Sequence, residues 1–166
     1  MLSMMHNMFK IRIADISDLK TLQRLGYELL RFEHDNWDST LDLAWPYSPS
    51  GEAIYRQAIL HKYTILAYLD NNPVGYLIGT VQTPPVSSAR STITAQLNNI
   101  YVCESARHSG IGHALVDNFY QYCANHQVDN INVTVNTANQ SAINFYEREG
   151  FLPSRLILTQ KIKPKN

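Results

Sequence analysis

Apolar and polar side chains alternate along residues 9–14 (FKIRIA), a pattern typical of a β-strand with one buried face. Further stretches rich in β-branched and aromatic residues predict strands over residues 63–69, 74–83, 93–102, 131–135 and 156–162. A turn-forming cluster, Asp70-Asn71-Asn72-Pro73, separates the second stretch from the third. These two strands are therefore expected to form an antiparallel hairpin.

Leucine recurs at three- and four-residue spacing from residue 19 onward, which predicts an amphipathic helix that ends near Phe32, with Asp15 or Ser17 as its N-cap. Residues 33–49 lose this period and contain two prolines, so a loop or a short broken helix is expected there. Three more helices are predicted over residues 50–62, 110–125 and 139–150, with Ser50 as the N-cap of the first.

The order of these elements mixes a hairpin with strand–helix–strand crossovers, which is typical of an α/β protein. We expect a three-layer α/β/α sandwich with a mixed, mostly antiparallel sheet. Residues 1–166 are expected to form a single domain, with residues 1–8 (MLSMMHNM) as a flexible leader rather than a signal peptide.

Composition narrows the class of protein. Apolar residues make up 45% of the chain and charged residues 17%, which indicates a globular domain rather than disorder. Because 14 basic residues balance 14 acidic ones, no net field favours nucleic acid or an anionic membrane. Cys103 and Cys123 match neither a disulfide framework nor a zinc site, so a cytoplasmic location is expected.

The segment of residues 97–112 (LNNIYVCESARHSGIG) predicts a strand, a glycine-containing turn and the start of a helix. Glycines at such a junction let a ligand approach the main chain, and N–H groups at a helix N-terminus favour an anion. A Walker A loop is excluded because Gly112 is followed by His113 and Ala114. The dinucleotide fingerprint fits poorly because Leu115 stands where a small residue is needed.

The spacing Arg107-x-x-Gly110-x-Gly112 resembles the pyrophosphate loop of the GCN5-related N-acetyltransferase (GNAT) family. A second match follows in residues 133–136 (VTVN), Asn139, Ala142 and residues 145–151 (FYEREGF). Both motifs occur in the family's order, and with the flanking elements the resemblance covers nearly the whole chain.

Membership of this family implies acetyl-CoA as co-substrate and no metal. Its pantetheine arm would lie between the strands at 97–102 and 131–136, which diverge, and main-chain groups of residues 100–102 would polarise the thioester carbonyl. The resemblance implies cofactor contacts at Ile100, Tyr101, Val102, Arg107, His108, Ser109, Gly110, Ile111, Gly112, His113, Asn139, Ala142 and Tyr146.

Tyr146 is the candidate general acid, because a phenol with a pKa of about 10 can protonate a thiolate whose conjugate acid has a pKa of about 8.5. Asn139 would either bond the pantetheine arm or simply cap its helix. Both interpretations remain open from the sequence.

The general base is less clear, because relatives place Glu on the strand where this chain has Asn98 and Asn99. Either water held by these amides accepts the proton, with Asn99 as the candidate, or a carboxylate reaches in from elsewhere. Glu33, with His34 and Asp35, is the candidate region, since the first helices wall the acceptor pocket in this family.

Acidic and aromatic residues are mixed in residues 33–47, which predicts either a site for a cationic amine or a solvated acidic loop with anchoring aromatics. The chain departs from the family at Glu104, where Pro is frequent, and at His108, where Gly is frequent. These changes would alter the stiffness of the loop.

The expected function is an N-acetyltransferase that moves an acetyl group directly from acetyl-CoA to a primary amine of a small molecule or peptide. The alternative is a non-catalytic acyl-CoA-binding sensor or interaction module, motivated by the missing strand Glu; a nucleotide-binding fold is a weaker third possibility. The expected partner is the amine acceptor, with no nucleic acid or membrane, and a homodimer is conceivable by analogy.

Overall fold

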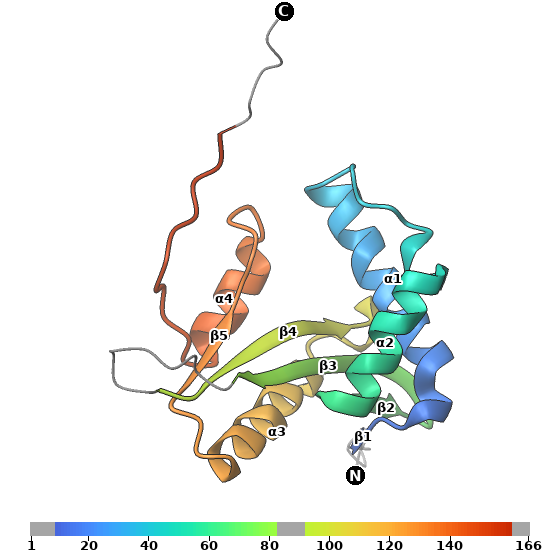
Figure 1. Cartoon of the computed structure of the whole chain (residues 1–166), viewed down its shortest axis with the longest axis horizontal. Coiled ribbons are helices and arrows are strands. Elements are labelled where there is room, and N and C mark those ends of the chain that lie inside the picture. The colour runs from blue at the N-terminus through green and yellow to red at the C-terminus, as the bar shows by residue number, and fades with distance from the viewer. Residues whose placement is uncertain (1–8, 83–91, 161–166) are drawn as a thin grey trace, which may run out of the picture. The chain divides into compact units, whose positions relative to one another are not determined.

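The computed structural model describes residues 9–82 and 92–160, and the chain divides into two compact units, Met1–Thr134 and Val135–Asn166 (Figure 1). Each unit is described by itself. The expected leader at residues 1–8 lies outside the described residues. No described helix combines the length and the apolar character needed to cross a membrane.

The first unit is built on one sheet with strand order β1-β2-β3-β4-β5. The strands are β1 (Lys10–Ile13), β2 (Tyr63–Leu69), β3 (Asn72–Gln82), β4 (Thr94–Val102) and β5 (Asn130–Val133). Neighbouring strands from β1 to β4 pair antiparallel, whereas β4 and β5 pair parallel. The expected mixed, mostly antiparallel sheet is confirmed.

The turn between β2 and β3 consists of Asp70 and Asn71, whose φ angles are 49° and 65°. Two central residues with positive φ are the mark of a type I′ hairpin turn, and Asp and Asn tolerate that region better than other non-glycine residues. The predicted antiparallel hairpin is therefore confirmed.

Three helices belong to the first unit: α1 (Leu19–Asn36), α2 (Pro49–His61) and α3 (Ile111–Asn125). The prediction that the first helix ends near Phe32 is wrong. It continues to Asn36, whose Nδ2 donates to the carbonyl of Phe32 at 2.7 Å, so Glu33 lies on a helical turn rather than in a loop. Single-turn 3₁₀ helices occupy Ile16–Asp18, Trp45–Tyr47 and Glu104–Ala106.

Two of the predicted caps are displaced. Ser48, not Ser50, caps α2, because its Oγ accepts from the N–H of Gly51 at 3.1 Å and Pro49 then fills the first helical position, where its missing N–H costs nothing. Asp15 caps the 3₁₀ turn before α1 by accepting from the N–H of Ser17 at 2.8 Å.

Helices cover both faces of the sheet in the first unit. In Figure 1, α1 and α2 lie on one face and α3 lies on the other. Tyr76 and Ile78 of β3 pack into the cluster formed with α1 and α2. Gly79, on the opposite face, leaves room for Phe119 of α3, since a Cβ there would lie 2.2 Å from that ring. The expected α/β/α layering is thereby confirmed.

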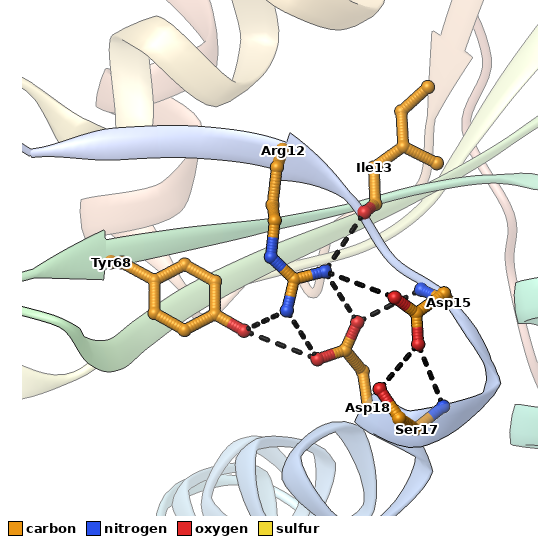
Figure 2. Close-up of polar contacts among 6 residues, drawn as sticks. All are labelled: Arg12, Ile13, Asp15, Ser17, Asp18 and Tyr68. Carbon is orange, nitrogen blue, oxygen red and sulfur yellow. Dashed lines mark hydrogen bonds and ion pairs between the residues drawn. The ribbon is translucent and has the colours of Figure 1, made fainter.

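A half-buried ion pair fixes the turn after β1 to the sheet (Figure 2). Both guanidinium amines of Arg12 donate to the carboxylate of Asp18, at 2.7 and 2.6 Å, and Tyr68 of β2 donates to the same carboxylate at 3.2 Å. The Asp18 side chain is only 6% exposed. The hydrogen bonds from Arg12 hold the pKa of Asp18 below its usual range.

The second unit contains α4 (Gln140–Arg148), which is capped by Asn139. The Asn139 Oδ1 accepts from the N–H of Ala142 at 3.0 Å. The predicted last strand is wrong for the part that the structure describes: residues 156–160 have no regular structure. Leu156, Ile157 and Leu158 are 74–84% exposed. Strand-forming residue types do not make a strand where no neighbouring strand pairs with them.

Candidate active site

β4 and β5 diverge after four paired positions. Their parallel pairing begins at Thr94 opposite Asn130 and ends at Leu97 opposite Val133, where β5 also ends. β4 continues to Val102 and is paired there only with β3 among the described strands. Among the described strands, residues 98–102 thus have no partner on the β5 side, which leaves an edge that an inserted extended ligand could pair with, except at the Val102 carbonyl, which accepts from Arg107.

A β-bulge at the fork separates the two consecutive asparagines. Ile78 is opposite Asn99 and Gly79 is opposite Leu97, so Asn98 is the extra residue. The Asn98 Oδ1 accepts from the hydroxyl of Thr80 at 2.6 Å. The bulge therefore commits Asn98 to the strand pair and leaves Asn99, which is exposed, to the pocket described below.

The predicted diphosphate loop joins β4 to α3. Gly110 has a φ of +85°, and an added Cβ would have no atom within 4 Å, so the main chain is open to a ligand there. Gly110 is also the N-cap of α3 and has no side chain to occupy the first-turn N–H groups. An open left-handed turn at the positive end of a 15-residue helix fits a diphosphate.

His108 adopts a left-handed conformation in the same loop, with φ 61°. A non-glycine residue is strained in that region. The sequence therefore places a side chain at a position whose conformation favours glycine.

Arg107 turns its side chain inward rather than toward the open side of the loop. Its Nε donates to the carbonyl of Val102 at 3.1 Å, and its guanidinium carbon lies 5.3 Å from the ring centre of Phe32 and 5.9 Å from that of Tyr101. The side chain of Arg107 therefore fixes the loop to β4 and α1.

Glu28 of α1 binds the end of β4. Its Oε2 accepts from the hydroxyl of Tyr101 at 3.2 Å and from the thiol of Cys103 at 3.4 Å, while Arg24 pairs with its Oε1 at 2.7 Å. Burial, with a smaller effect of Glu28, raises the pKa of Tyr101 to about 12 and also raises the pKa of Cys103. A protonated, hydrogen-bonded thiol is a structural group rather than a nucleophile.

A pocket of about 120 Å³ opens between the helices and the sheet of the first unit. It is lined by parts of α1, α2, the 3₁₀ turn at Trp45–Tyr47, β3 and β4. The lining residues are Gly26, Leu29, Leu30, Glu33, Trp45, Ile54, Tyr55, Ala58, Lys62, Tyr76, Ile78 and Asn99. The pocket thus brings together Glu33 and Asn99, two of the three predicted catalytic residues.

Glu33 is half-buried in this pocket, and desolvation raises the pKa of its carboxyl. Burial, with a smaller effect of the Glu33 charge, raises the pKa of Tyr55 to about 12 and that of Tyr76 well above its ordinary value. The Glu33 carboxylate makes no hydrogen bond or ion pair to another side chain of the described part of the chain. It is available to accept a proton from a ligand.

The remaining acidic residues of the 33–47 segment serve local structure instead. His34 contacts Asp35 at 2.9 Å, Asp38 accepts from the N–H of Thr40 at 3.1 Å, and Asp42 accepts from the N–H of Ala44 at 2.9 Å. All three aspartates are exposed, and neither they nor His34 lines the pocket. Of the three candidate bases, only Glu33 lies on it.

Tyr146, Asn139 and Ala142 belong to the second unit. Tyr146 packs against Phe145 and Phe151, with ring centres 5.3 and 5.5 Å away. Asn139 has the capping role that the sequence allowed. Their contacts with the cofactor, like those assigned to the loop residues, stay predictions.

The sequence did not point to Lys62, Tyr55 or Tyr76 as site residues. Gly51, Tyr55, Ala58 and Lys62 are four, three and four residues apart, the spacing of one helical face, and this signal could have found Tyr55 and Lys62. Nothing in the sequence distinguishes Tyr76 from other strand residues. Among the described residues, no group of three or more His, Cys, Asp or Glu is placed to hold a metal ion.

The chain was compared with known protein families. The sequence model of the acetyltransferase (GNAT) family matches residues 28–151. No curated protein matches the chain in a sequence search.

Solved structures of similar fold cover nearly the whole chain. A tetramutant of the BH1408 protein from Bacillus halodurans is 19% identical, with a TM-score of 0.80 over 92% of this chain and 99% of that one. The aminoglycoside N-acetyltransferase AAC(6')-Iy, in complex with CoA, is 17% identical, with a TM-score of 0.72 over 93% and 95%. An aminoglycoside acetyltransferase from an uncultured soil metagenomic sample is 21% identical, with a TM-score of 0.69 over 96% and 98%.

Proposed function

Because the chain belongs to the acetyltransferase (GNAT) family, we propose that it transfers the acetyl group of acetyl-CoA directly to a primary amine of a small molecule or peptide. The observation that carries this proposal is the position of Asn99. It lies on the part of β4 that has no described partner strand on the β5 side, where the thioester would be held, and it also lines the pocket that contains Glu33. A cofactor cleft and an acceptor pocket that share one residue suit a direct transfer.

The residues around the fork fit acetyl-CoA. When bound, the co-substrate supplies an activated thioester carbonyl and a thiolate leaving group. The turn at Gly110 and the first N–H groups of α3 would bind its diphosphate. The main-chain edge of Ile100, Tyr101 and Val102, apart from the Val102 carbonyl that Arg107 occupies, would hydrogen-bond the pantetheine arm and donate to the thioester oxygen. Arg107 would act by keeping the loop in place.

Three side chains would carry out or assist the proton transfers. Glu33 would accept a proton from the substrate ammonium, because a carboxylate with a raised pKa is a better base near neutral pH than an ordinary one. Asn99 would orient the amine or a water molecule between the amine and Glu33. Tyr146 would donate the proton that the leaving sulfur takes.

A carboxylate in the pocket favours this enzyme over an acyl-CoA sensor. The sensor was motivated by the absence of a strand Glu, and Glu33 offers a base from α1 instead. We further propose that the chain is a single acetyltransferase domain, because the family match at 28–151 spans both compact units.

The test is an acetyl-transfer assay with a panel of primary amines, which follows release of free CoA thiol and identifies the acetylated product by mass. We expect amine-dependent thiol release, and Glu33→Gln should lower kcat/KM about 100-fold if Glu33 is the base. Glu52→Gln, an exposed residue of α2 paired with Arg56, is the matched control and should keep wild-type activity. Binding of acetyl-CoA without thiol release for any amine would favour the sensor.

A further inference from the structure

The pocket is small and mostly apolar. Its volume of about 120 Å³ is below that of a ~150 Å³ cavity, which accommodates benzene. The space therefore suits a small ligand group. Leu29, Leu30 and Trp45 contribute apolar surface, and Tyr55 and Tyr76 are almost fully buried. Such a space fits an amine carbon with a short branched apolar group better than the linked rings of an aminoglycoside.

The pocket carries one acidic and one basic side chain. Glu33 lines it from α1, and Lys62 lines it from the residue that follows α2. Neither side chain forms an ion pair within residues 9–82 and 92–160. The exposed Asp35, Asp38 and Asp42 lie outside the lining, so the pocket is not an acidic one.

We propose that the acceptor is a small apolar α-amino acid, whose ammonium group lies at Glu33 and whose carboxylate lies at Lys62; this inference rests on the proposed acetyl transfer. A zwitterion satisfies both charges of the pocket at once. A polycation such as a polyamine or an aminoglycoside would bring a second positive charge toward Lys62, where no acidic lining residue other than Glu33 can compensate.

The reaction balances without any further reagent. The acetyl carbon forms a bond to the amino nitrogen as its bond to sulfur breaks. The ammonium group loses two protons in total: one goes to Glu33 and then to solvent, and the other replaces the proton that Tyr146 gives to the departing sulfur. The products are an N-acetylated amino acid and free CoA.

The experiment compares pairs of acceptors that differ only in the carboxylate. We expect leucine to exceed isoamylamine in kcat/KM by about tenfold, which corresponds to about 1.4 kcal/mol. Leucine methyl ester, spermidine and kanamycin should also fall below leucine. In Lys62→Met the preference for leucine over isoamylamine should narrow to about twofold, and Lys62→Arg should restore it. Lys20→Met, an exposed lysine of α1 that is outside the lining, should keep the full preference.

The possible results distinguish the proposed amino-acid acceptor from the proposed acetyl transfer on which it rests. Thiol release in which isoamylamine or spermidine equals or exceeds leucine would overturn the amino-acid assignment and leave the acetyltransferase intact. A preference for leucine that survives Lys62→Met would overturn the role of Lys62. No thiol release with any acceptor would overturn both proposals.

Discussion

Glu33 is the residue on which the chemistry depends most, and its surroundings predict a pH dependence. Desolvation raises the pKa of Glu33, so the base form increases with pH through a range above the ordinary carboxyl value of 4.5. We expect kcat to rise with pH through this apparent pKa. In the pH profile of kcat, Glu33→Gln should remove the rise that is due to Glu33. It should keep only the rise that is due to deprotonation of the acceptor ammonium.

The two limbs can be separated with acceptors of different amine pKa. The limb due to Glu33 should stay in place when the acceptor changes, whereas the limb due to the ammonium should move with it. An acid limb that persists unchanged in Glu33→Gln would contradict the role of Glu33 as the base.

Asp18 gives a second prediction at this scale, concerning stability. Its folded-state pKa lies below the ordinary value of 3.8, so its contribution to stability is present above that pH and is lost as pH falls through the folded-state pKa. Asp18→Asn should reduce the free energy of unfolding by about 2 kcal/mol at pH 7, because Arg12 loses its buried partner but is itself 45% exposed.

Urea unfolding at several pH values measures this effect. The difference between wild type and Asp18→Asn should shrink as the pH falls through the folded-state pKa of Asp18, because the native carboxyl is then protonated. Glu52→Gln, which breaks an exposed pair, should change the unfolding free energy by less than about 0.5 kcal/mol. A loss from Asp18→Asn that is the same at every pH would contradict the ion-pair explanation.

At the scale of elements, the contact between β3 and α3 depends on a missing side chain. A Cβ on Gly79 would lie 2.2 and 2.3 Å from two ring atoms of Phe119, closer than side chains approach one another. Gly79→Ala should therefore destabilise the fold by about 2–3 kcal/mol. Phe119→Leu alone leaves a cavity, and the double variant should be more stable than the sum of the two changes predicts. Strict additivity in urea unfolding would contradict the steric explanation.

Most elements could be predicted from the sequence because their periodicity is local. The hairpin at Asp70 and Asn71 follows from turn residues that tolerate positive φ. The end of α1 was missed, since polar residues 33–36 carry no apolar period although their main chain remains helical. The last strand was predicted in error because a strand depends on a paired neighbour, which no local pattern specifies.

At the scale of the whole molecule, the diphosphate loop was easier to predict than the acceptor pocket. The loop is a contiguous stretch in which glycines mark the turn. The pocket combines residues from positions 26 to 99, and apart from the helical spacing of Tyr55, Ala58 and Lys62 its members share no sequence signal. The bulge that distinguishes Asn99 from Asn98 is likewise a property of strand pairing.

The account depends centrally on the turn at Gly110 as the site that binds the diphosphate of CoA. Titration calorimetry with CoA and acetyl-CoA tests it, with Gly110→Glu as the disruptive variant and Gly110→Ala as the control for left-handed strain. We predict saturable binding to the wild type, a loss of at least about 100-fold in affinity for Gly110→Glu, and a loss of less than about tenfold for Gly110→Ala. No detectable binding of CoA, or equal affinity in wild type and Gly110→Glu, would contradict the account.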